Sequence, residues 1–91
     1  MKTKSIIYGL FFLLLGTSVK AADNKVGINL YESGMLGEAK VFFLNNLKQL
    51  QDEALRAEAC YYLGECYLET GVPDSASIYY QEGLTLKPDY P

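Results

Sequence analysis

The 91-residue chain contains no histidine, so it lacks the side chain that most often serves as general base and as metal ligand. Its eight basic residues are outnumbered by eleven acidic ones. Binding of nucleic acid normally needs a basic face that neutralises phosphates, so no nucleic-acid partner is expected. The eight glycines are dispersed and form no phosphate-binding loop. We therefore expect no enzyme, no cofactor and no metal site.

Only two cysteines are present, Cys60 and Cys66, in a stretch with helical periodicity. Six residues advance a helix by about 9 Å and turn it onto another face, whereas a disulfide needs Cα atoms within about 7 Å. The spacing is also neither that of a redox pair nor that of a zinc knuckle. We expect two small buried side chains, with an intermolecular disulfide as the alternative. Glu65 and Glu69, with no third ligand, are interpreted as part of a solvated face.

The first 21 residues have the three parts of a secretory signal peptide. Lys2 and Lys4 precede an apolar run over residues 6–15, and small residues follow up to Ala21. Cleavage there would leave an exported domain of residues 22–91, periplasmic or secreted, with five basic and eleven acidic residues. The run is shorter than the ~20 residues that span a bilayer. An uncleaved membrane anchor stays open, because residues 5–19 carry no charge.

After residue 22, apolar residues recur at intervals of three and four, which is typical of amphipathic helices. Gly71 suits the left-handed conformation that ends a helix, and Pro73 blocks its continuation. Asp52 and Asp74 are predicted N-caps, and the short links force consecutive helices to pack antiparallel. We predict an all-α fold with helices at residues 24–33, 38–49, 53–70 and 75–87.

The order of residue types over residues 57–88 is more specific than the periodicity. It comprises Leu63, Gly64, Tyr67, Ala76, Tyr80 and Pro88. This order resembles the tetratricopeptide repeat (TPR), a helix–turn–helix unit of about 34 residues. Residues 23–51 look like a weaker copy, displaced by 37 residues, with additional residues near 49–53. The departures from the family pattern are Asp23, Asn46, Cys60 and Gly83.

The resemblance implies a short α-solenoid with a degenerate repeat at about 23–51 and a better-formed one at about 54–88. It also implies a non-catalytic interaction module or scaffold of the cell envelope or secreted compartment, which binds a partner peptide or helix in a concave groove. The tyrosines and glutamates at the groove positions suit a basic or apolar partner segment. The residues that match groove positions are Asn24, Ile28, Tyr31, Glu32, Glu58, Tyr61, Glu65, Leu68 and Glu69.

The last predicted helix presents apolar residues with no following repeat to cover them, although such units usually need three or more. One alternative is therefore self-association through this helix, with Tyr79 and Leu84 as the contact residues. Another is that the chain is the N-terminal part of a larger TPR-containing signalling or enzyme polypeptide.

Overall fold

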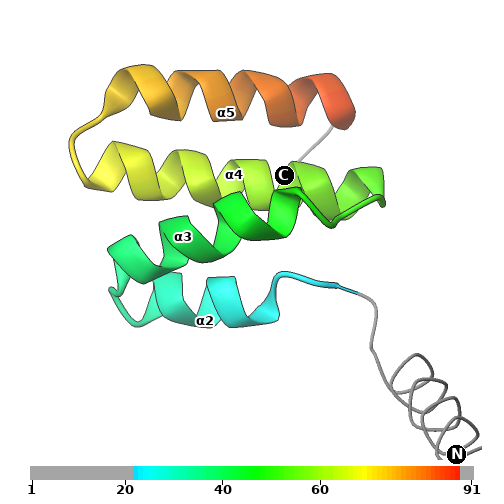
Figure 1. Ribbon diagram of the computed structural model, residues 1–91. Helices are drawn as coiled ribbons and strands as arrows, with labels where there is room; N and C mark the ends of the chain where they lie inside the picture. Colours follow the sequence, from blue (N-terminus) through cyan, green and yellow to red (C-terminus); the bar gives the residue numbers. More distant parts are fainter. Residues whose placement is uncertain (1–21, 89–91) are drawn as a thin grey trace, which may run out of the picture.

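The computed structural model describes residues 22–88, which form four α-helices and no strand. They are α2 (Lys25–Glu32), α3 (Leu36–Leu47), α4 (Glu53–Glu69) and α5 (Pro73–Leu86). Consecutive helices lie side by side and run antiparallel (Figure 1), and α2 also contacts α4. The all-α fold and the antiparallel packing are confirmed. The proposed signal peptide lies outside the described residues. None of the four helices is long and apolar enough to cross a bilayer.

Glycine ends two of the helices, as the left-handed backbone at these positions requires. Gly34 follows α2 with φ 81°, and Gly71 follows α4 with φ 83°. The Asp52 side chain caps α4 by accepting from the Leu55 amide at 3.1 Å. The same role predicted for Asp74 is wrong, because α5 begins earlier, at Pro73. Proline lacks an N–H and has a helical φ, so it starts the helix and leaves Asp74 within the first turn.

Within each antiparallel pair, a glycine of the first helix lies against an aromatic ring of the second. A Cβ on Gly27 would lie 2.6 Å from Cζ of Phe43, and a Cβ on Gly64 would lie 2.6 Å from Cε1 of Tyr80. Both residues of the second contact are 37 positions beyond those of the first. The α2–α3 and α4–α5 pairs therefore share one packing contact at equivalent positions.

The core lies mainly where α3 and α5 pack on either side of α4. The Phe43 ring stacks on Tyr62 with centroids 5.8 Å apart, and Tyr67 stacks on Tyr79 at 5.6 Å. The fully buried hydrophobic side chains, each with no more than 1% of its surface exposed, are Ala39, Phe43, Ala57, Ala59, Cys60, Leu63, Cys66 and Ala76. Both cysteines are free thiols in this core, which confirms the prediction of small buried side chains.

Two of the departures from the family pattern contact each other across the α4–α5 interface. A Cβ on Gly83 would lie 3.2 Å from Cβ of Cys60 and 3.4 Å from the Ala57 carbonyl oxygen. A side chain at residue 83 would therefore crowd α4. The absence of one lets the two helices approach, which offsets the lower helix propensity of glycine.

Residues 48–52 connect the two helix pairs, and a side chain of α4 fixes this loop through hydrogen bonds. The Arg56 guanidinium donates to the carbonyl oxygens of Leu47 at 2.9 Å and Leu50 at 3.0 Å. Leu47 is the last residue of α3 and Leu50 lies in the loop, so these bonds satisfy two carbonyls outside the helical hydrogen-bond pattern. Leu50, only 4% exposed, anchors the loop in the core.

Candidate functional site

The candidate site is the face that α2 and α4 form together, and its centre is a cluster of tyrosines and carboxylates. The Tyr31 hydroxyl of α2 donates to the Glu69 carboxylate of α4 and lies 3.3 Å from Oε1 of Glu65. The Tyr80 hydroxyl of α5 donates to the other oxygen of Glu65. Glu65 is therefore the residue through which α2, α4 and α5 are linked.

This arrangement raises the pKa of the tyrosines on the face. The hydrogen bond to Glu69 is the largest cause for Tyr31, followed by burial. For Tyr80, burial is the largest cause, followed by the hydrogen bond to Glu65. Burial also raises the pKa of Tyr62, to which the nearby charges of Glu58 and Glu32 contribute. The face consequently combines neutral hydroxyl groups with carboxylates.

A buried amide network closes one end of the same face. Asn24, 1% exposed, donates from Nδ2 to the Leu55 carbonyl oxygen and to Oε1 of Glu58, both at 2.9 Å. Its Oδ1 accepts from Nδ2 of Asn46 at 2.9 Å, and Asn46 also donates to the Asp23 carbonyl oxygen at 2.8 Å. No buried side-chain polar atom among residues 22–88 lacks a partner. The network joins the start of α2 to both α3 and α4.

The residues predicted for the groove lie on α2 and α4, except Asn24, which directly precedes α2. Tyr31, Glu65 and Glu69 are joined by hydrogen bonds, and the Tyr61 ring lies 5.2 Å from Tyr62 and 6.3 Å from Tyr80. Leu68 is half-exposed. Glu58, by contrast, is held by Asn24, and Asn24 itself is buried, so neither is fully presented to a partner.

The two residues predicted for self-association have different surroundings on α5. Tyr79 is half-buried, because its ring stacks on Tyr67 with an interplanar angle of 4°. Leu84 is 50% exposed. Tyr79 therefore contributes to the α4–α5 packing, and of the two only Leu84 presents much of its surface.

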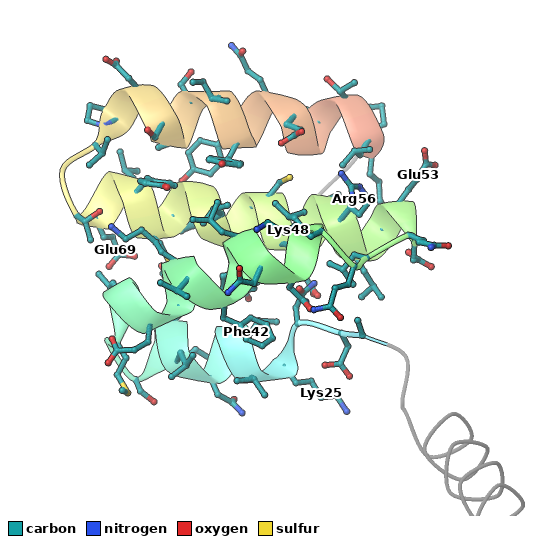
Figure 2. All side chains as sticks on the ribbon, in the orientation of Figure 1. Lys25, Phe42, Lys48, Glu53, Arg56 and Glu69 are labelled. Atoms are coloured by element: carbon teal, nitrogen blue, oxygen red, sulfur yellow. The ribbon has the colours of Figure 1, made fainter. Side chains whose placement is uncertain are left out.

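The sequence pattern did not assign a role to three polar residues of this structure. Asn46 and Arg56 make the buried bonds described above, and Lys40 places its Nζ 5.1 Å from the centre of the Tyr67 ring. The one available signal was Asn46, a polar residue at a position where the TPR pattern has alanine. Figure 2 shows Arg56 near the start of α4 and Glu69 near its opposite end.

A pocket of about 370 Å³ lies beside the α3–α4 loop. Its lining residues are Ala22, Gln49, Leu50, Gln51, Asp52 and Leu55, and none of these is a predicted groove residue. Within residues 22–88, no three His, Cys, Asp or Glu side chains are grouped so that they could hold a metal ion.

No family model, curated protein or solved structure matches this chain. The class of the protein is therefore defined by its own geometry. It is an all-α unit of antiparallel helix pairs, with tyrosines and carboxylates gathered on the side where α2 and α4 meet.

Proposed function

We propose that this protein is a non-catalytic interaction module of the TPR type, which binds a peptide or helix of a partner protein on the α2–α4 face. The observation that carries the proposal is the glycine-to-ring contact that recurs after 37 residues, Gly27 with Phe43 and Gly64 with Tyr80. It supports two repeats, at about 23–51 and 54–88. In this family the first helices of successive repeats line the binding surface, and here those helices are α2 and α4.

The chemistry of the face favours a basic or apolar partner segment. Tyrosine supplies rigid contact area, and carboxylates select positive charge. Two basic residues of α3 and α4 are engaged elsewhere, Lys40 with the Tyr67 ring and Arg56 with two backbone carbonyls. We name the proposed contact set the acidic strip, and it consists of Tyr31, Glu32, Tyr61, Glu65, Leu68 and Glu69.

The proposed place of action is the cell envelope or the secreted compartment. The support for it is the signal-like N-terminal segment, with its basic start, apolar run and small residues up to Ala21. There the protein would serve as a scaffold, holding a partner rather than transforming it.

The test must remove charge from the strip without breaking the packing. Glu65 is unsuitable, because it accepts the Tyr31 and Tyr80 hydroxyls. Glu32→Gln with Glu69→Gln removes two charges, and a glutamine at residue 69 can still accept from Tyr31. The matched control is Glu38→Gln with Glu53→Gln, two exposed acids in the first turns of α3 and α4.

The measurement begins with selection of peptides from a displayed library of short random sequences against the purified protein. The affinity of the enriched peptide is then measured by fluorescence anisotropy for the two double variants. We expect the strip variant to bind more weakly and with a smaller dependence on salt, and the control to match the parent protein. Equal weakening in both variants, or no enrichment of basic or apolar peptides, would contradict the proposal.

A further inference from the structure

The exposed hydrophobic side chains fall into two groups when the 37-residue relation between the helix pairs is applied. Met35 and Val72 are one equivalent pair, 43% and 39% exposed, and both precede the second helix of their pair. Val41 and Ile78 are another, 59% and 63% exposed. These four side chains remain exposed in both pairs, so stacking of one pair on the next does not cover them.

Two other exposed side chains have a covered counterpart. Val26 on α2 is 57% exposed, whereas Leu63, its equivalent on α4, is completely buried in the core with residues of α3. Leu84 on α5 is 50% exposed, whereas Leu47, its equivalent on α3, packs against the same core. The difference arises because α3 and α4 cover each other. The outer face of α2 and the outer face of α5 have no such neighbour within residues 22–88.

The same comparison explains the exposure of Leu68. Its equivalent is Tyr31, whose ring lies edge-on to Tyr62 at 5.4 Å and whose hydroxyl donates to Glu69. Tyr31 is thus covered by the following pair, whereas Leu68 is 51% exposed. Leu68 and Leu84 therefore belong to one open end of the stack, and Val26 belongs to the other.

We propose that a second copy of this chain covers these surfaces, with its α2 packed on the α5 end of the first copy. This packing between two copies would resemble the contact that α3 and α4 make within one chain. Val26 of the second copy would occupy the place of Leu63, and Leu84 of the first copy would occupy the place of Leu47, both of which pack in the internal core. The argument rests on the continuity of this contact with the internal interface, and it goes beyond peptide binding on the acidic strip without depending on it.

The proposed contact is weaker than its internal counterpart. Gln81 stands where α3 has Leu44, and Asn29 stands where α4 has Cys66. Less apolar surface is then buried, so association should depend on protein concentration. The contact is also heterologous, because it joins two different faces of the protein. Each added copy leaves one face free, so the contact produces open rows or closed rings of copies. A two-fold pairing of α5 with α5 would instead stop at a dimer.

Cross-linking with a short bis-maleimide distinguishes these arrangements. The protein is purified after expression of the full chain, and its N-terminus is read by mass spectrometry. Val26→Cys and Leu84→Cys are made separately, one with an affinity tag, and are mixed. Val41→Cys replaces Val26→Cys in the control mixture, since residue 41 is equally exposed but outside the proposed contact. The parent protein measures the background from the buried Cys60 and Cys66.

We expect cross-linked dimers of the mixed Val26→Cys and Leu84→Cys chains at several times the level of the control mixture. Efficient linking of Leu84→Cys to itself would overturn the proposal in favour of a two-fold contact. Equal levels in the test and control mixtures would overturn it as well. Because both engineered sites are on the surface, circular dichroism should show parent-like helicity. As a second measurement, Val26→Asp should reduce the sedimentation mass at high concentration, and Val41→Asp should not.

Discussion

Asn46 offers the sharpest test of how the helix pairs are joined. The TPR resemblance places alanine at this position, and alanine has the highest helix propensity, so Asn46→Ala would be neutral or stabilising if only the pattern mattered. In the structure, Asn46 is 6% exposed and donates to Asn24 and to the Asp23 carbonyl oxygen. Its removal leaves a buried acceptor on Asn24 with no donor. The structure therefore predicts that Asn46→Ala destabilises the protein.

The magnitude follows from the two hydrogen bonds. Loss of the donor to the buried Oδ1 of Asn24 costs about 1–3 kcal/mol, and loss of the donor to the partly solvated Asp23 carbonyl about 1 kcal/mol. The better helix propensity of alanine returns about 0.5 kcal/mol. We expect Asn46→Ala to lower the free energy of unfolding by about 1.5–3.5 kcal/mol. This is a large fraction of the roughly 3–10 kcal/mol typical of a domain this small.

Urea unfolding followed by far-UV circular dichroism measures this change. Asn45→Ala is the matched control, because Asn45 is the preceding residue of α3 but is exposed. It should be neutral or slightly stabilising. Combining Asn46→Ala with Asn24→Ala should cost less than the sum of the single changes, since the two side chains share a bond. A variant at residue 46 as stable as the parent would refute the assigned role of the network.

Two further predictions concern the packing around α4. Gly64→Ala should lower the free energy of unfolding by about 1–3 kcal/mol, because its Cβ would meet the Tyr80 ring. The control Gly37→Ala has no atom within 4 Å of the new Cβ and should stabilise the protein by up to ~1 kcal/mol. Thermal unfolding measures both changes. Burial raises the pKa of the Cys60 and Cys66 thiols from 9.0 to about 11, so the folded state holds these protons more tightly. The stability that the protonated thiols contribute is fully present below pH 9.0 and should be lost as the pH rises through 11. Urea midpoints that do not change over this pH range would contradict the buried state of the thiols.

Local signals predicted the helices well because each boundary depends on one or two neighbouring residues. Gly71 needs only its own backbone conformation, and Asp52 needs only the amide three residues later. The prediction failed for Asp74, where Pro73 starts the helix first. It also placed the start of α3 two residues late, at Glu38 instead of Leu36, because no side chain caps that helix.

The polar contacts could not be predicted in the same way. Asn24 is 22 residues from Asn46 and 34 from Glu58, so the bonds exist only once three helices have their final positions. Repeat position assigned Tyr31 and Glu65 to the same predicted groove but gave no contact between them. The bond of Glu65 to Tyr80 on a third helix could not be inferred from the spacing.

The amide network at the start of α2 also affects the order in which the chain can fold. With eight residues, α2 is shorter than the roughly 12–15 residues that an isolated helix needs to be stable in water. Its fixed end depends on Asn46, Leu55 and Glu58, which leave the ribosome 22, 31 and 34 residues after Asn24. We therefore expect α2, the first of the four helices to be synthesised, to become stable only after α3 and α4 have formed.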